Sequence, residues 1–211
     1  MYANLLARLI DGDLPAGSPL NIDALSRELQ VSPTPIREAL ARLEATGLVT
    51  RAALRGYQVS PLFSPRELSD LMDARGAIEP VLAGLACARS TPALLGELDA
   101  AIADLSAAAS ERAPGELHTY WEADHRFHVL IAQHADNRFL ESAYEALGGH
   151  VQRFRLFSEL GLTDIEYAVA EHTRILDAFR RGSVEEARER MAEHIAQVKS
   201  RALHDREAIA D

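Results

Sequence analysis

The sequence predicts a mainly α-helical protein, in which a small domain of three helices and a β-hairpin precedes an antiparallel all-α bundle of six or seven helices. Three observations predict this. Apolar residues recur at the three- and four-residue spacing of helices through most of the 211 residues. Alanine and leucine are abundant while aromatic residues make up 6%, which favours helix over sheet. Serine, threonine or asparagine, often followed by proline, recurs where such helices would begin.

The first 60 residues carry the signals of the small domain. Asn21 and Ser32 are good helix N-caps, and Pro33 takes the first helical position after Ser32. Gly47 follows the last apolar residue of that helix, a position typical of a helix end. Two β-like stretches then lie on either side of a turn that contains Gly56. We expect helices at about 3–11, 22–30 and 33–46, a turn at 14–19 and strands at 48–50 and 57–59, which together form a winged helix-turn-helix.

The sequence predicts helices through the rest of the chain. Ser64, Pro65 and Glu67 form a capping-box pattern with proline at the first helical position, so a helix begins there. We expect helices at about 65–89, 92–112, 115–135, 137–159, 164–181 and 184–204, joined by short connections as in a bundle. The expected domains are therefore 1–60 and 65–211, with a linker at 61–64.

Charge is unevenly distributed along the chain. Residues 1–60 hold six arginines and six acidic residues, so the net charge of −10 belongs to the remainder. An acidic surface repels phosphate, and any DNA contact is therefore expected within the first 60 residues. Cys87 is the single cysteine, which provides no disulfide framework and fits a reducing compartment. No apolar run reaches the roughly 18 residues of a membrane helix, so we expect a cytoplasmic protein with no membrane partner.

The segment 31–49, VSPTPIREALARLEATGLV, is the most distinctive stretch of the chain. Ser32 and Thr34 lie at a helix N-terminus, where free N–H groups and the helix dipole favour phosphate. Arg37 lies one turn further on and can reach base edges in the major groove of DNA. The alternative for Arg37 is a surface ion pair with Glu38 or another neighbour.

This segment resembles the recognition helix of the GntR family of bacterial regulators. The stretches 12–20 and 55–59 fit the same family pattern, and the resemblance spans residues 5–60. It implies a DNA-binding domain whose wing approaches the minor groove through a glycine, while the wing arginines either touch phosphate or are solvated. The candidate DNA-contacting residues of the wing are Arg51, Arg55 and Gly56.

Four ionisable residues occupy positions where helical stripes would place apolar side chains. Asp124 and His128 interrupt one stripe one turn apart, and His172 and His194 interrupt two others. Such groups are costly to bury unless something compensates them, and a cation bound by all four would do so. Three imidazoles and one carboxylate, with no thiolate, suit Zn²⁺, Ni²⁺, Mn²⁺ or Fe²⁺. The alternative is that each is a hydrogen-bonded core residue.

The second domain, over residues 65–204, resembles the FadR C-terminal (FCD) ligand-binding domain of GntR regulators. The resemblance rests on Asp124-x-x-Phe127-His128, Glu171-His172-x-x-Ile175-x-x-Ala178 and Met191-x-x-His194. It implies a metal that helps to hold a small carboxylate effector, such as a sugar acid or hydroxy acid. It also implies that Arg75 pairs with the effector carboxylate, although Arg75 could instead pair with Glu79 one turn further on. His150 lies near an apolar seam, where it could line the effector pocket or pack in the core.

Together these observations predict a homodimeric transcription regulator, with two winged domains on a near-palindromic operator. The resemblance adds repression of transcription that a small carboxylate, bound beside the metal, relieves. One alternative is a metal sensor, in which the ion itself is the signal. A metal-dependent enzyme with a DNA-binding head is less expected, because we find no further carboxylate at a general-base position and no nucleophile motif.

Overall fold

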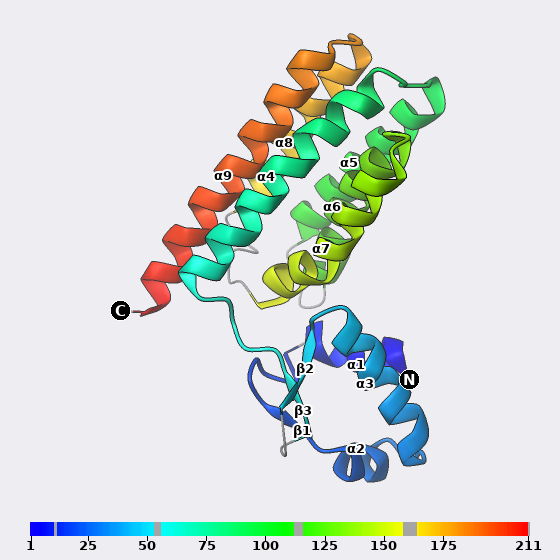
Figure 1. The fold of residues 1–211 in the computed structure, drawn as a ribbon, viewed down its shortest axis with the longest axis vertical. Helices are drawn as coiled ribbons and strands as arrows, with labels where there is room; N and C mark the ends of the chain where they lie inside the picture. Colours follow the sequence, from blue (N-terminus) through cyan, green and yellow to red (C-terminus); the bar gives the residue numbers. More distant parts are fainter. Residues whose placement is uncertain (11, 53–55, 112–115, 158–163, 211) are drawn as a thin grey trace. The chain divides into compact units, whose positions relative to one another are not determined.

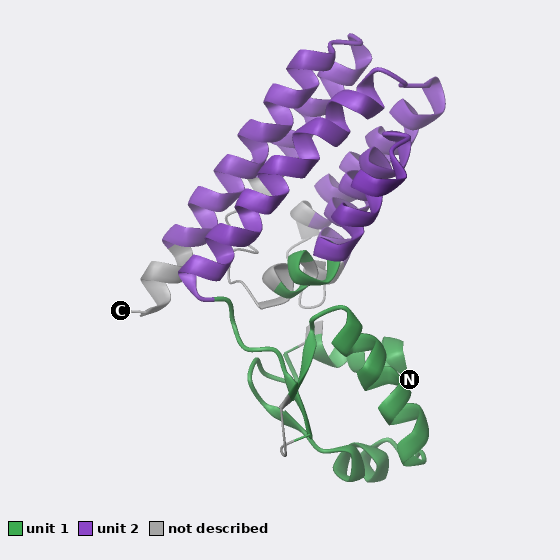
Figure 2. Cartoon of the chain, in the orientation of Figure 1, with its two compact units in different colours: residues 1–63, 148–157 green, residues 64–147, 158–211 purple. Residues whose placement is uncertain are grey.

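The structure is a computed structural model that describes residues 1–10, 12–52, 56–111, 116–157 and 164–210. The chain divides into two compact units, Met1–Phe63 with Gly148–Phe157 and Ser64–Leu147 with Ser158–Asp211 (Figure 2). The first division falls between Phe63 and Ser64, within the segment 61–64 that we expect to be a linker. The segment 148–157 belongs to the first unit, whereas the sequence alone would place it in the second domain.

The winged helix-turn-helix forms most of the first unit. Its helices are α1 (Tyr2–Ile10), α2 (Ile22–Glu28) and α3 (Pro33–Ala45), and its strands are β1 (Pro19–Leu20), β2 (Val49–Ala52) and β3 (Gly56–Val59) (Figure 1). The three strands form one antiparallel sheet in the order β1-β3-β2. The side chain of Asn21 accepts a hydrogen bond from the N–H of Ala24 at 2.9 Å, so the predicted cap of α2 is confirmed.

Strand β1 corrects the expected turn at 14–19. Pro19 pairs with Gln58 and Leu20 with Tyr57, so β1 adds an edge strand to the hairpin. Two residues are too few to show an alternating pattern, and their partners lie far away in the sequence. Proline is tolerated there because an edge strand needs no ladder N–H on its outer side.

The core of the first unit is aliphatic. Helix α3 buries the face with Leu40 and Leu43, and Leu48 packs in the same core just before β2; all three side chains are fully buried. They pack with Leu5 of α1 and Val59 of β3. Burial of this face fixes which side of α3 remains exposed.

Six helices make up the rest of the described chain, and the prediction of a mainly α fold is confirmed. They are α4 (Pro65–Cys87), α5 (Pro92–Glu111), α6 (Glu116–His134), α7 (Arg138–Phe157), α8 (Asp164–Arg180) and α9 (Val184–Ala210). Helix α4 begins at the predicted capping box, in which the N–H of Glu67 donates to Oγ of Ser64 and the N–H of Ser64 donates to Oε2 of Glu67. Helix α9 runs past the expected end at 204, because no glycine or proline interrupts it.

Helices α4 and α9 lie side by side and run in opposite directions (Figure 1). Gly84 on α4 permits this close packing, since a Cβ there would lie 2.8 Å from Cγ of Arg188 on α9. Over the part of the chain that the structure describes, no helix combines the length and apolar character that a membrane span requires.

Candidate metal centre

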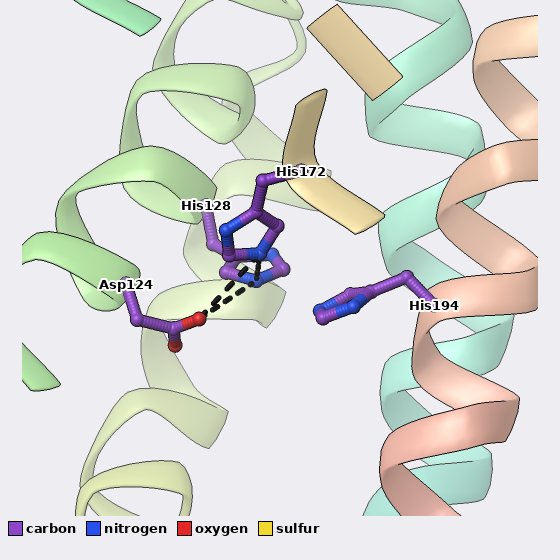
Figure 3. Close-up of side chains that lie close together, drawn as sticks. All are labelled: Asp124, His128, His172 and His194. Atoms are coloured by element: carbon purple, nitrogen blue, oxygen red, sulfur yellow. Dashed lines mark hydrogen bonds and ion pairs between the residues drawn. The ribbon is translucent and has the colours of Figure 1, made fainter. Parts of the chain in front are cut away.

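Three helices of the second unit bring the four predicted metal ligands together. Asp124 and His128 lie one turn apart on α6, His172 lies on α8 and His194 on α9. All four are buried, and one nitrogen or carboxylate oxygen from each lies within 4.8 Å of the other three. Figure 3 shows the four side chains pointing into one space, with His194 facing Asp124 across it. We refer to these residues as the His₃Asp cluster.

Helical periodicity explains why these residues meet. The cluster replaces one or two positions in each of three apolar stripes, whose neighbouring described positions are buried or, at Val169 and Val184, partly buried. The buried neighbours are Trp121 and Ile131 on α6, Leu176 and Phe179 on α8, and Met191 and Val198 on α9.

Distances within the cluster fit a divalent cation. Nε2 of His172 lies 3.3 Å from Nε2 of His128 and 3.5 Å from Oδ1 of Asp124, and the latter two atoms are 3.9 Å apart. A tetrahedral site with Zn–N bonds of about 2.0–2.1 Å has ligand atoms about 3.3–3.4 Å apart. These three atoms are therefore close to tetrahedral spacing, and His194, whose ligand atom lies within 4.8 Å of them, would have to move closer to complete such a site.

A carboxylate on α4 contacts the first of the histidines. Oε2 of Glu79 lies 2.7 Å from Nδ1 of His128, and Oε1 of the same carboxylate lies 2.5 Å from Nε of Arg75. Both Arg75 and Glu79 are 2% exposed. In the neutral imidazole, a proton on Nδ1 leaves the lone pair on Nε2, which is the nitrogen that faces Asp124 and His172.

A second carboxylate, on α8, contacts His194 in the same way. Oε2 of Glu171 lies 2.7 Å from Nδ1 of His194, and Nη1 of Arg201 donates to Oε1 of Glu171 at 2.8 Å. The ring of His172 is held differently, since it stacks on Phe127 with the ring centroids 4.3 Å apart and the planes 19° from parallel.

Burial and ion pairing set the charges around the cluster. Burial alone would raise the pKa of the Glu79 carboxyl, but Arg75 and His128 outweigh it and hold this pKa well below its usual range. Burial also opposes the charge on Glu171, yet its hydrogen bonds with His194 and Arg201 bring the pKa of that carboxyl below its ordinary value. Burial lowers the pKa of His128, which favours the neutral imidazole that ligates metals.

Sequence reasoning gave Glu79 only as a possible partner of Arg75, and Glu171 only as part of a motif, so neither was predicted to contact a histidine of the cluster. Glu79 has the i, i+4 spacing from Arg75 that many exposed ion pairs have, so its pattern alone does not indicate burial. Glu171 precedes His172 in the sequence but faces His194 in the structure, a contact between two helices that no local pattern reveals. A charged residue on an otherwise buried helical face is the signal that could have found Glu79.

The two residues proposed to bind an effector lie in different surroundings. Arg75 is buried and pairs with Glu79, which itself contacts the His₃Asp cluster through His128. His150 is exposed on the part of α7 that belongs to the first unit, 6.3 Å from the ring of Phe63 between centroids. The structure therefore brings Arg75 to the neighbourhood of the cluster, whereas His150 belongs to the other compact unit.

The candidate DNA-contacting residues are placed by α3 and the hairpin. Ser32, Thr34 and Arg37 are exposed at and after the start of α3, and the Ser32 side chain makes no capping hydrogen bond. Gly56 is exposed with φ of +80°, a conformation that favours glycine. Arg51 is exposed on β2, with its guanidinium 5.6 Å from the centre of the Tyr57 ring; Arg55 lies outside the described residues.

Comparison with known proteins agrees with this architecture. The FCD domain matches residues 70–197, and the family "Bacterial regulatory proteins, gntR family" matches residues 1–59. A probable D-xylose utilization operon transcriptional repressor of Paenarthrobacter nicotinovorans is 27% identical, with 91% of this chain and 82% of the relative covered. The galactonate operon transcriptional repressor of Escherichia coli is 26% identical, with 82% of each covered.

A solved structure supports the same fold. The Escherichia coli protein McbR/YncC has a TM-score of 0.77 at 22% identity, over 96% of this chain and 95% of that one. Both family matches follow the order in which the winged helix-turn-helix and the helical domain occur in the chain. The chain belongs to the GntR family of bacterial transcriptional regulators, and its helical domain is an FCD domain.

Proposed function

We propose that this protein is a homodimeric repressor whose binding to operator DNA is controlled by a small carboxylate, bound beside a divalent metal ion in the FCD domain. One observation carries the proposal: Asp124, His128, His172 and His194 converge while buried, with atoms that can ligate a metal within 4.8 Å of one another. Burying four polar groups in a helical core without a common ligand would cost free energy of folding.

The donor set favours a borderline or hard divalent ion. Imidazole suits Zn²⁺, Ni²⁺ and Fe²⁺, carboxylate suits Mn²⁺ as well, and no thiolate among the four selects a soft ion. The cluster would hold such an ion, which would supply a Lewis acid for an anionic oxygen. This chain's own residues would orient the effector and exclude water from it.

Arg75 supports a carboxylate as the effector. Guanidinium groups bind carboxylates well, and the buried guanidinium of Arg75 lies beside the cluster. Nε and Nη2 already donate to Glu79, so an effector carboxylate would share this guanidinium with Glu79. The relative named for galactonate regulates the operon of a sugar acid, whereas the relative named for D-xylose regulates that of a neutral sugar. The buried arginine favours the acid for this chain.

Operator binding would use α3 and the wing. Exposed Thr34 and Arg37 would enter the major groove, Ser32 would contact phosphate, and Gly56 would let the wing backbone approach the minor groove. Two copies related by a twofold axis would bind a near-palindromic site.

Thermal unfolding of the purified protein tests the proposal. The protein should be stabilised by Zn²⁺, and D-galactonate should stabilise it further while the neutral sugar galactose should not. A ligand at 100 times its dissociation constant adds about 2.7 kcal/mol to the free energy of unfolding. The galactonate effect should disappear after chelation and in Arg75→Met.

Operator release then separates the two candidate signals. DNA selected from a random pool should dissociate on addition of the carboxylate at constant Zn²⁺. Dissociation on Zn²⁺ alone, with no carboxylate effect, would instead make the ion the signal, which is the metal-sensor alternative. A protein that neither Zn²⁺ nor any carboxylate stabilises would refute both forms of control.

A further inference from the structure

Two buried carboxylates outside the His₃Asp cluster each contact one of its histidines. Glu79 lies 2.7 Å from Nδ1 of His128, and Glu171 lies 2.7 Å from Nδ1 of His194. Each carboxylate is held in turn by an arginine, Arg75 in the first case and Arg201 in the second. The two sets come from different helices, so their similarity does not follow from one local sequence pattern.

We infer that Glu79 and Glu171 are positioning residues of the metal site, which direct the Nε2 atoms of His128 and His194 toward the ion. The inference rests on the metal site proposed above. An imidazole that gives its Nδ1 proton to a carboxylate keeps its lone pair on Nε2 and has its ring orientation fixed. The tautomer and the ring orientation of both histidines would then already be set before the metal binds.

The two arginines extend this control by one further contact. Arg75 bonds Glu79 through Nε at 2.5 Å, and Arg201 spans both oxygens of Glu171 at 2.8 and 3.1 Å. A carboxylate anchored at its far side cannot rotate away from the imidazole without losing an ionic hydrogen bond. The arginines therefore hold the carboxylates. Glu171 hydrogen-bonds Nδ1 of His194, whereas Glu79 lies 2.7 Å from Nδ1 of His128 without the alignment of a hydrogen bond, so the control is stronger at His194.

Geometry also distinguishes the third histidine. The ring of His172 lies nearly parallel to that of Phe127, with 4.3 Å between the centroids, and is itself fully buried. Its orientation is thus set by an aromatic surface. Substitutions at the two glutamates should affect metal binding through His128 and His194 while His172 stays in place.

The contact between Glu171 and His194 is the better one to test. Arg201, the partner of Glu171, is 19% exposed and can remain solvated when Glu171 is replaced. Zn²⁺ affinity would be measured by competition with a chromophoric chelator, for the full chain and for Glu171→Gln and Glu171→Ala. Glu193→Gln is the matched control, since Glu193 lies on α9 beside His194 and pairs with Arg190 on the surface.

We expect Glu171→Ala to weaken Zn²⁺ binding by about 10–100-fold, the usual effect of losing such a partner. Glu171→Gln should lose less, because its amide oxygen can still accept the Nδ1 proton. Glu193→Gln should leave the affinity unchanged. Arg201→Met, which keeps Glu171 but frees its far side, should give a smaller loss than Glu171→Ala.

Two further readouts separate positioning from folding. The thermal midpoint of the metal-free variants should stay close to that of the parent chain, and the visible absorption of bound Co²⁺ should change in Glu171→Ala but not in Glu193→Gln. Equal Zn²⁺ affinity in Glu171→Ala and the parent, or equal losses in Glu171→Ala and Glu193→Gln, would overturn the inference and leave the metal site standing. Absence of Zn²⁺ binding by the parent chain would refute the metal site itself, and the inference with it.

Discussion

Arg75→Met provides a quantitative test of the buried ion pair on α4. Arg75 and Glu79 are each 2% exposed, with Nε of the arginine 2.5 Å from the carboxylate. Removing the arginine leaves the Glu79 charge buried, with the imidazole of His128 as its remaining described polar contact. Breaking a buried pair in this way costs about 3–5 kcal/mol, whereas replacing both charges is often close to neutral. We therefore expect a loss of about 3–5 kcal/mol in the free energy of unfolding.

The same helix offers a matched control for this substitution. Arg66 and Asp70 have the same i, i+4 spacing on α4, but their side chains are 92% and 71% exposed and lie 3.9 Å apart. Exposed pairs contribute little, so Arg66→Met should leave stability unchanged within error. The difference between the two variants then measures burial rather than the loss of an arginine.

Trp121 gives a convenient probe for this experiment. It is the single tryptophan of the chain, is 9% exposed and lies on α6, so its fluorescence follows unfolding of the second unit. Urea unfolding of the metal-free protein would be measured for Arg75→Met, Arg66→Met and Arg75→Met/Glu79→Gln. The double variant should recover most of the lost stability. A loss in Arg75→Met no larger than in Arg66→Met, or no recovery in the double variant, would refute the reasoning.

Three other predictions concern pH, helix packing and DNA. Burial lowers the pKa of His128, so as the pH falls the unfolded chain binds a proton at this histidine before the folded chain does. The free energy of unfolding of the metal-free protein should therefore fall as the pH drops below about 6.5. Urea titrations down to about pH 5 should show a shallower fall for His128→Gln. Gly84→Ala should destabilise by about 1–3 kcal/mol in thermal unfolding, because its Cβ would clash with Arg188. Gly96→Ala, with nothing within 4 Å, should be neutral or stabilising, and the same sign for both would contradict this packing argument. Arg37→Ala should lose about 1–3 kcal/mol of discrimination between operator and mutated duplexes in binding titrations, whereas an equal loss on every sequence would assign Arg37 to phosphate.

The cluster could be predicted from sequence because helical periodicity is a strong local signal. His172 and His194 each replace an apolar residue in a regular stripe, so their inward direction follows from spacing alone. The packing of the helices brings the four ligand atoms within 4.8 Å of one another, and residue spacing does not determine that packing.

Contacts between distant segments account for what the sequence did not reveal. Strand β1 consists of two residues whose partners are Gln58 and Tyr57, and Glu171 meets a histidine of another helix. Glu79 was visible only as a possible partner of Arg75, since the i, i+4 pattern is the same on exposed and buried helical faces. In each case the missing information is tertiary.

The two arginines that pair with Glu79 and Glu171 also affect the charge balance of the metal centre. Arg75 matches the charge of Glu79, and Arg201 matches that of Glu171. Since metal ligands are deprotonated, Asp124 would contribute one net negative charge in the proposed metal-bound site, and the three histidines none. A divalent cation would turn this into one net positive charge in a poorly solvated interior. A single carboxylate would bring the sum to zero, whereas a neutral sugar would leave it positive and a dianion would overshoot. If the proposed metal is bound, electroneutrality would favour a monoanion over a neutral sugar or a dianion as the ligand of this interior.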